Sequence, residues 1–308
     1  MRTEIGDLRR VVLRAERCGR RVVVGGHSLG GSITTAYATW NFHGRPGARG
    51  LSGLVFIDGG SVRAGVSAAR ARSELETLST SSPWLIFGNI PAPYTGLFNT
   101  GGALLALKAP NRPSIAQPSG IIPSFINPPF PVTNRAQYGY ALDTETSPPA
   151  LIAAQAHIGH MAASGHPRRW VSDEITPITR YAKMFAGRGL QGLDGTAWYH
   201  PERLTLDSGA VNNGNRNPAQ SVMGVRATMG HRLPRRLRMY AFGAALGGKA
   251  VLTATRQLAR QSHIPRRRLV LVDRHATYAH NDPAGAAPKH NVFLRHLLPF
   301  LRRIGRTR

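Results

Sequence analysis

A serine flanked by glycines lies near the N-terminus, in the pattern Gly26-His27-Ser28-Leu29-Gly30. A β-branched run precedes it and a segment rich in Ala, Thr and Ile follows, so a strand should enter the turn and a helix should leave it. Glycines two residues to either side allow the strand and the helix to approach closely around a strained serine. The N–H of Leu29, at the helix N-terminus, would then point at a developing oxyanion. The motif predicts that Ser28 is a nucleophile and Leu29 an oxyanion donor.

A serine nucleophile needs a general base, which should come from a loop after the last strand. Four histidines lie in this region: His275, His280, His290 and His296. His280 is favoured because Asn281-Asp282-Pro283 follows it, a turn sequence that can hold a loop over the sheet edge. His290 and His296 fall at or within the last predicted helix and are expected at the surface. A solvated side chain is the alternative for each of the four, and we predict the catalytic role for His280.

The elements that would position these residues alternate along the chain. Apolar and β-branched runs predict strands at residues 21–25, 51–57, 238–242 and 268–272, and helical spacing predicts helices at 3–17, 29–40, 248–260 and 291–304. Between residues 61 and 229 prolines and glycines concentrate, and short helices are expected at 151–163 and 175–187. The alternation implies an α/β fold with a parallel sheet and a long insertion.

On these segments the chain resembles the α/β-hydrolases, and bacterial esterases and lipases among them. The matching parts are the elbow strand, Ser28, the later strands and the terminal histidine loop with its helix, within residues 1–60 and 235–308. The resemblance implies a hydrolase core at residues 1–60 and 230–308 with a helical and irregular cap at 61–229. It also implies acyl transfer, in which His280 takes the Ser28 proton, the serine attacks an ester carbonyl and water hydrolyses the acyl-enzyme.

The acid of the triad is less clearly marked. Most members of the family carry it after the strand two beyond the elbow strand, but residues 241–246 contain no carboxylate. Asp58, at the end of the strand next to the elbow strand, occupies the alternative position that some lipases of this fold use. Asp58 capping the turn at Gly59-Gly60 is the competing interpretation. Asp273 and Asp282 are near His280 in sequence, where an orienting bond is geometrically awkward.

The family also carries several strands before the elbow strand, and a loop among them supplies a second oxyanion N–H. Here a single predicted helix precedes residue 21. We therefore expect a sheet that lacks its N-terminal strands and has an unpaired edge at residues 21–25. Losing one oxyanion donor costs on the order of 100- to 1,000-fold in rate. The chain is accordingly expected to be a fragment of a longer hydrolase, weakly active or inactive alone.

The composition restricts the disulfides, membrane spans, cofactors and partners that this chain could have. The 308 residues carry a net charge of +25, and their single cysteine, Cys18, excludes an internal disulfide. No apolar run is long enough for a membrane span. We find no metal or nucleotide motif, so no cofactor is expected; Gly247-Gly248-Lys249 lacks the remainder of a phosphate loop. The last 79 residues carry a local charge of +15 and should bind polyanions nonspecifically.

Several alternatives remain open at this point. The charge indicates either a polyanionic partner or the arginine-rich codon usage of a GC-rich genome, and no specific nucleic-acid motif accompanies it. Aromatic residues of the insertion, among them Trp84, Phe87, Tyr94, Phe125 and Phe130, line either a pocket for a bulky or lipidic ester or a small core of the cap. Two other functions compete with ester hydrolysis: a basic binding protein that kept the fold without catalysis, and acyl transfer to an acceptor other than water.

Overall fold

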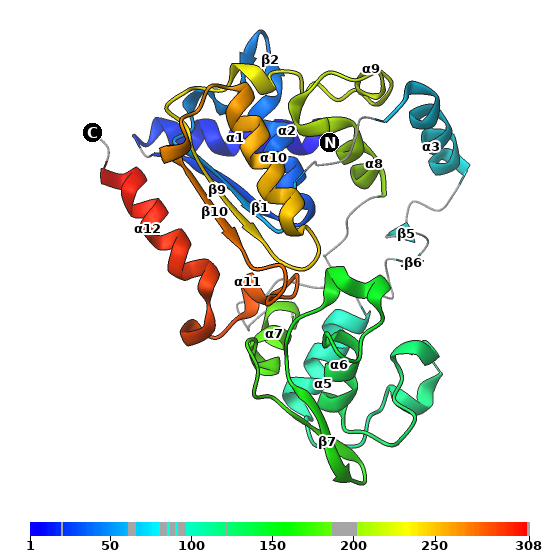
Figure 1. The fold of residues 1–308 in the computed structure, drawn as a ribbon. Helices are drawn as coiled ribbons and strands as arrows, with labels where there is room; N and C mark the ends of the chain where they lie inside the picture. The colour runs from blue at the N-terminus through cyan, green and yellow to red at the C-terminus, as the bar shows by residue number, and fades with distance from the viewer. Residues whose placement is uncertain are drawn as a thin grey trace. The chain divides into compact units, whose positions relative to one another are not determined.

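The computed structural model describes residues 1–19, 21–60, 66–80, 85–86, 90–91, 97–120, 122–186 and 202–306 (Figure 1). The chain forms two compact units. The first comprises Met1–Pro83, Pro201–Thr277 and Phe293–Arg308, and the second comprises Trp84–His200 and Tyr278–Val292.

A parallel sheet lies at the centre of the first unit. Its four strands are β1 (Val23–His27), β4 (Gly53–Ile57), β9 (Arg238–Gly243) and β10 (Leu269–Asp273), in that order across the sheet. Every neighbouring pair is parallel, with Val24 opposite Leu54 and Ile57 opposite Phe242. This confirms the α/β class with a parallel sheet. Within the described part of the chain β1 pairs only with β4, so it is an edge strand.

Helices cover both faces of this sheet. In Figure 1, α1 (Arg2–Arg17), α2 (Leu29–Thr39) and α10 (Gly248–Gln261) lie on one side and α12 (Val292–Arg306) on the other. Successive side chains of a strand point to opposite faces, so each strand contributes residues to both sides of the sheet. Met239 and Ala241 join the main core of the unit, whereas Tyr240 packs against Phe293 and Phe300 of α12.

The same unit includes smaller elements on either side of the insertion. They are the hairpin β2 (Asn41–Phe42) and β3 (Arg45–Pro46), and the helices α3 (Ala68–Thr80), α8 (Glu202–Val211) and α9 (Ala219–Met223). Buried side chains of α3, α8 and α9, among them Ala71, Leu204 and Met223, belong to the main core.

The second unit has its own hydrophobic core. Its elements are β5 (Leu85–Ile86), β6 (Ile90–Pro91), α5 (Ala103–Lys108), α6 (Asn134–Leu142), β7 (His160–Gly165), β8 (Arg168–Val171), α7 (Ile178–Phe185) and α11 (Asp282–Gly285). The core contains Tyr138, Trp170 and Tyr181. Trp170 lies flat against Gly139, where any side chain would collide with the indole, and its ring N–H donates to the carbonyl of Ile158 at 3.0 Å.

Two expectations about the insertion need correction. The predicted helix at 151–163 is wrong: a 3₁₀ segment at Pro149–Ala154 is followed by strand β7. Gly159, within that range, has a φ of 123°, which a helix cannot contain. The helix predicted at 175–187 is shorter and spans Ile178–Phe185.

The division of the chain also differs from the expected boundaries. Helices α3, α8 and α9 were expected in a cap at 61–229, but they pack into the core of the first unit. Residues 278–292, which carry His280, were expected in a core at 230–308, but they belong to the second unit. The reason is that this loop makes its hydrogen bonds to residues of the insertion, as shown below. Among the described helices, none combines the length and the apolar character needed to span a bilayer.

The packing of α12 on the sheet generates a first prediction. Phe300 is 2% exposed and contacts Tyr240, so Phe300→Ala should lower the free energy of unfolding by about 3–5 kcal/mol through lost burial and a cavity. Leu298, on the same helix but 47% exposed, is the control, and Leu298→Ala should change stability by less than about 1 kcal/mol. Urea unfolding measures both, and equal losses would contradict this orientation of the helix.

Candidate active site

Ser28 lies in a strained turn between β1 and α2. Its φ and ψ are 56° and −124°, a conformation that non-glycine residues rarely adopt and that costs on the order of 1–3 kcal/mol. Hydrogen bonds on either side fix the turn: Ser28 N–H donates to the carbonyl of Ile57, and Gly31 N–H donates to the carbonyl of Ser28, both at 2.9 Å. The surrounding backbone therefore holds the serine in this conformation.

Close backbone approaches explain the glycines around Ser28. A Cβ on Gly26 would collide with the carbonyl of Gly30, one on Gly31 with the carbonyl of Gly59, and one on Gly59 with the carbonyl of Ser28. A Cβ on Gly30 would meet nothing within 4 Å. The sequence motif thus identified one essential glycine correctly, Gly26, whereas the others the turn needs are Gly31 and Gly59 rather than Gly30.

The start of α2 is suited to a negative charge. The first N–H groups of a helix, here including that of Leu29, have no acceptor within the helix. Ser28 is the N-cap residue, yet its side chain makes no capping hydrogen bond, and the first turn contains no acidic residue. The hydroxyl is therefore not used to complete the helix, and the predicted oxyanion donor lies at a helix N-terminus.

Asp58 follows β4 and is 1% exposed, with a φ of 46°. Its carboxylate accepts hydrogen bonds between 2.6 and 3.2 Å from four backbone N–H groups of the β9–α10 loop: those of Ala244, Leu246, Gly247 and Gly248. Three of these bonds go to Oδ1 and one to Oδ2. Asp58 therefore caps the N-terminus of α10 and supplies the anion for the glycine pair there.

Burial separates the four candidate histidines. His280 is 1% exposed, whereas His290 and His296 are exposed. His275 is exposed too, and its Nδ1 lies 2.6 Å from Oδ1 of Asp273. That bond holds the pKa of Asp273 below its ordinary value. The structure thus places Asp273 with His275, and among these histidines only His280 lies in a buried environment, as expected of an oriented base.

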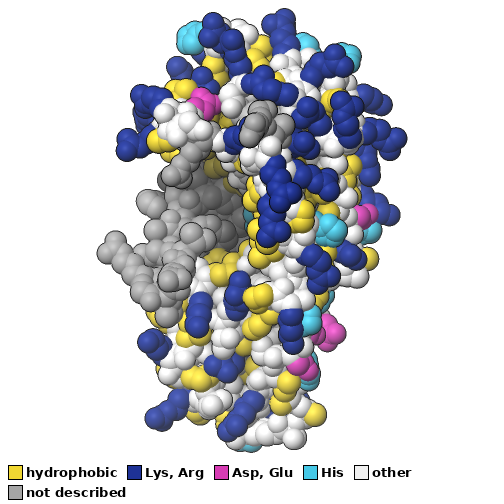
Figure 2. All heavy atoms as spheres, turned by 90° about the vertical axis from the view of Figure 1, so that its left-hand side faces the viewer, with side chains coloured by type: hydrophobic (Ala, Val, Ile, Leu, Met, Phe, Trp, Pro, Cys, Tyr) yellow, Lys and Arg dark blue, Asp and Glu magenta, His cyan; other side chains and the backbone are white. Residues whose placement is uncertain are grey.

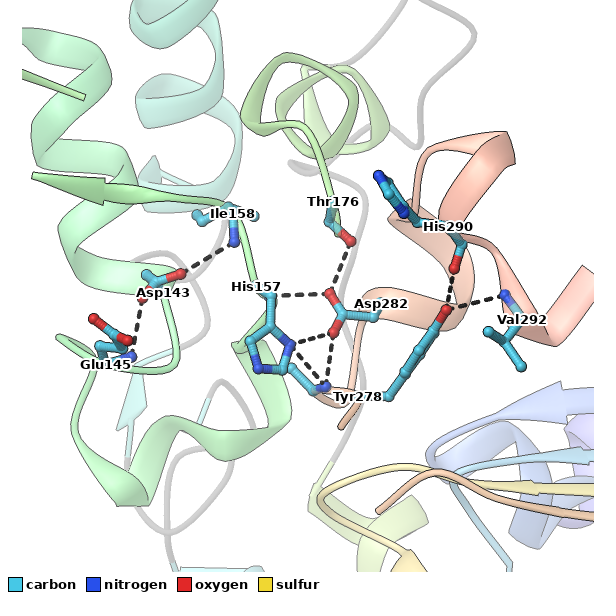
Figure 3. Close-up of polar contacts among 10 residues, drawn as sticks. Asp143, Glu145, His157, Ile158, Thr176, Tyr278, Asp282, His290 and Val292 are labelled. Atoms are coloured by element: carbon cyan, nitrogen blue, oxygen red, sulfur yellow. Dashed lines mark hydrogen bonds and ion pairs between the residues drawn. The ribbon is translucent and has the colours of Figure 1, made fainter. Parts of the chain in front are cut away.

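The loop that carries His280 is anchored by Asp282, which is fully buried (Figure 3). Oδ2 of Asp282 lies 2.6 Å from Nδ1 of His157 and accepts the N–H of Ala279 at 2.7 Å. Oδ1 accepts the hydroxyl of Thr176 at 2.8 Å and the backbone N–H of His157 at 3.0 Å. One carboxylate therefore joins the loop to two segments of the insertion.

Further bonds reinforce this anchor on both sides of His280. The amide of Asn281 donates to the carbonyl of Ala153 and to the hydroxyl of Tyr181, each at 3.1 Å. Tyr278 closes the loop, because its hydroxyl donates to the carbonyl of His290 and accepts the N–H of Val292 (Figure 3). The histidine loop is thus an integral part of the second unit.

His157 is the residue that sequence reasoning missed. The hydrogen bond with Asp282 raises the pKa of its imidazole, burial opposes this rise, and the charges of Glu174 and Asp143 add to it. Its side chain is 30% exposed, so the ring is oriented by a buried carboxylate but still reaches solvent. A carboxylate on Nδ1 is the arrangement that fixes the tautomer of a general base. A buried carboxylate such as that of Asp282 needs hydrogen-bond donors, but the sequence does not indicate which residues supply them.

Asp143 lies on the other side of His157 and forms the edge of the same polar cluster. Its carboxylate accepts the backbone N–H groups of Glu145 and Ile158 at 2.9 and 3.1 Å (Figure 3). Burial raises the pKa of this carboxyl group, and those backbone bonds oppose the rise. The charges of three carboxyl groups, those of Asp282, Glu174 and Asp143, thus all raise the pKa of the His157 imidazole and favour its protonated form.

Only some of the aromatic residues expected in an apolar pocket lie within the described part of the chain. Trp84, Phe87 and Tyr94 of the expected apolar pocket lie outside the described residues. Phe125 is 60% exposed, and Phe130 lies beneath the guanidinium of Arg168 at 4.0 Å, so these two rings do not form a shared cavity wall. The part of the chain that the structure describes contains no group of three or more His, Cys, Asp or Glu side chains placed to hold a metal ion.

Ser28, Leu29 and Asp58 belong to the first unit, whereas His280 belongs to the second. Within the first unit, Ser28 and Asp58 follow the neighbouring strands β1 and β4 at the same edge of the sheet. Comparison with protein-family models, curated proteins and solved structures finds no match for this chain.

The two glycines of the serine motif give a matched pair of variants. Gly26→Ala should destabilise the fold by about 1–3 kcal/mol or more, because the new methyl group collides with the backbone of α2. Gly30→Ala meets open space within a helix and should cost nothing, or stabilise by up to about 1 kcal/mol. Thermal or urea unfolding checks both, and a destabilising Gly30→Ala would contradict the turn geometry.

The His157–Asp282 pair predicts how stability depends on pH. Because the folded state holds the pKa of His157 above its ordinary 6.5, protonation stabilises the second unit. This contribution is fully present below pH 6.5 and is lost as the pH rises through the folded-state pKa. His157→Gln should remove this slope from urea unfolding measured across the range, whereas His160→Gln, at an exposed ion pair with Asp173, should retain it. An unchanged slope in His157→Gln would refute the assignment.

Proposed function

We propose that this chain is a serine hydrolase that cleaves carboxylic esters through an acyl-enzyme, as the α/β-hydrolases do. One observation carries the proposal: the conformation of Ser28, with φ and ψ of 56° and −124°, between a parallel strand and a helix N-terminus. Strain of this kind persists where the surroundings over-determine it, and such positions cluster at functional sites. The sheet would then be of the α/β-hydrolase type, with the second unit supplying its cap.

The proposed reaction follows the chemistry of a serine, a histidine and a carboxylate. The Ser28 hydroxyl attacks the ester carbonyl while His280 takes its proton, and the N–H of Leu29 stabilises the oxyanion. His280 then protonates the leaving alcohol, which gives the acyl-enzyme. A water molecule, deprotonated by the same imidazole, releases the carboxylic acid and restores Ser28. Asp58 is the proposed acid, and the same carboxylate caps α10.

The buried environment of His280 and the orientation of His157 both bear on which imidazole is the base. His280 follows β10 in sequence, as the resemblance implies, and its loop is held by Asn281 and Asp282. His157 has a buried carboxylate, that of Asp282, on Nδ1. We retain His280 as the proposed base, and variants at both positions distinguish the two.

Two further candidates differ in what Ser28 does. In a basic binding protein that kept the fold, the turn would remain for structural reasons and the hydroxyl would not react. In an acyltransferase, the acyl-enzyme would form but an alcohol, thiol or amine would replace water. Reactivity of Ser28 separates the first from the other two, and the fate of the acyl group separates those.

A fluorophosphonate probe tests the proposal directly, because labelling requires a reactive serine and an oxyanion donor but no turnover. We expect the probe on Ser28 by peptide mass spectrometry, and its loss in Ser28→Ala. Ser32→Ala, four residues further along the same helix, should label normally. His280→Ala should slow labelling by about 100-fold or more, the contribution of a general base.

The outcomes that contradict the proposal are distinct. A folded wild-type chain that does not label, or labelling that survives Ser28→Ala, would show that Ser28 is not a reactive nucleophile in this chain and would favour the binding protein. Labelling slowed by His157→Gln but not by His280→Ala would instead keep the nucleophile and reassign the base. Circular dichroism of each variant shows that the fold is intact.

A further inference from the structure

The outward face of α12 combines exposed leucines with arginines. Leu294 and Leu298 are 36% and 47% exposed, and Arg302 follows at the same four-residue spacing, so the three lie along one side of the helix. Arg295 and Arg306 are exposed as well. The helix sequence contains no Asp or Glu. We call these five residues, Leu294, Arg295, Leu298, Arg302 and Arg306, the α12 face.

The inward side of α12 fixes this orientation. Phe293, Phe300 and Ile304 are buried. The rings of Phe293 and Phe300 contact Tyr240 of β9, and Cδ1 of Ile304 approaches Gly53 of β4 so closely that a Cβ there would lie 2.7 Å away. The helix cannot turn its exposed leucines inward without losing this packing, so they stay at the surface.

Further arginines surround the C-terminal end of α12. Burial lowers the pKa of Arg238 at the start of β9, and repulsion from the charges of Arg268 and Arg303 lowers it further. Exposed arginines continue the basic surface at positions 235, 236, 266 and 267. Residues 230–272 contain no Asp or Glu at all. Figure 2, which views the side on which α12 lies in Figure 1, shows Lys and Arg side chains crowded among hydrophobic ones, with few acidic side chains.

We propose that the α12 face docks this protein onto an anionic lipid bilayer. Arginines near an anionic membrane surface each contribute favourably, and their long side chains reach the headgroups while leucines enter the boundary with the acyl chains. A nucleic acid would use the arginines but not the exposed leucines, and the α12 face has no aromatic ring on which bases could stack. The pairing of apolar and basic side chains therefore selects a lipid surface.

The helix α10 offers a matched control for charge. Arg256 and Arg260 are exposed and four residues apart, as Arg302 and Arg306 are on α12, and α10 covers the opposite side of the sheet (Figure 1). The double variants Arg302→Gln/Arg306→Gln and Arg256→Gln/Arg260→Gln thus remove the same charge from helices on different faces. A third variant, Leu294→Ser/Leu298→Ser, removes the apolar component and leaves the charge unchanged.

The experiment measures co-sedimentation of the whole chain with phosphatidylcholine vesicles, with and without phosphatidylglycerol. We expect binding only to the anionic vesicles. Arg302→Gln/Arg306→Gln should weaken it by up to about 30-fold, and Leu294→Ser/Leu298→Ser by about tenfold. Arg256→Gln/Arg260→Gln should have a much smaller effect. Circular dichroism confirms that each variant is folded.

Three results would overturn the proposal. Equal losses in the α10 and α12 arginine variants would show that net charge alone attracts the vesicles. Unchanged binding of Leu294→Ser/Leu298→Ser would show that no side chain enters the bilayer. Duplex DNA bound more tightly than anionic vesicles at equal salt, and weakened by Arg302→Gln/Arg306→Gln, would assign the α12 face to nucleic acid. None of these measurements depends on whether Ser28 reacts.

Discussion

The backbone around Ser28 depends on a single constraint: three strand ends must meet with almost no space between them. The serine follows β1, Asp58 and Gly59 follow β4, and residues 244–248 follow β9. Gly59 lies directly against the carbonyl of Ser28, and Asp58 binds the N–H groups of the next loop. Strain at Ser28 is thus offset by packing and hydrogen bonds that involve its neighbours. A side chain at Gly59 would push the end of β4 away from Ser28, and one at Gly26 would push α2 away from β1, which is why both positions are glycine.

A buried carboxylate has the same organising role in each unit, by different means. Asp58 accepts four backbone N–H groups of the β9–α10 loop, a set of donors that depends on the path of the chain. Asp282 instead accepts side-chain donors from His157 and Thr176, more than 100 residues away in sequence. Removing the donors of either carboxylate would leave a buried negative charge without hydrogen bonds, which would strongly destabilise the fold. The position of His280 consequently depends on the folding of the insertion, because the residues on both sides of it are bonded there.

These differences explain what could be predicted from the sequence. The strands and helices of the first unit were predictable because apolar runs and helical spacing are local signals, and the serine turn was predictable because glycine at Gly26 has a local steric cause. The helix prediction at 151–163 was wrong because its apolar residues fit a helix, whereas Gly159 has a positive φ and lies against the carbonyl of Val171, a contact that the local sequence does not reveal. The pairing of His157 with Asp282 is a contact between distant segments, and periodicity contains no information on such contacts.

The net charge of the chain and the positions of its arginines have different explanations. A genome that favours arginine codons raises the net charge everywhere, and such a bias by itself predicts no particular surface. It does not explain why acidic residues are absent from residues 230–272 and from α12, nor why leucines stay exposed between the arginines of that helix. Folding brings the start of β9, the residues before β10 and the end of α12 together, and so concentrates arginines that are scattered in sequence. Repulsion among them destabilises the folded state, and an anionic surface that lies against them would relieve it. The position of these arginines, more than their number, therefore carries the argument for a partner.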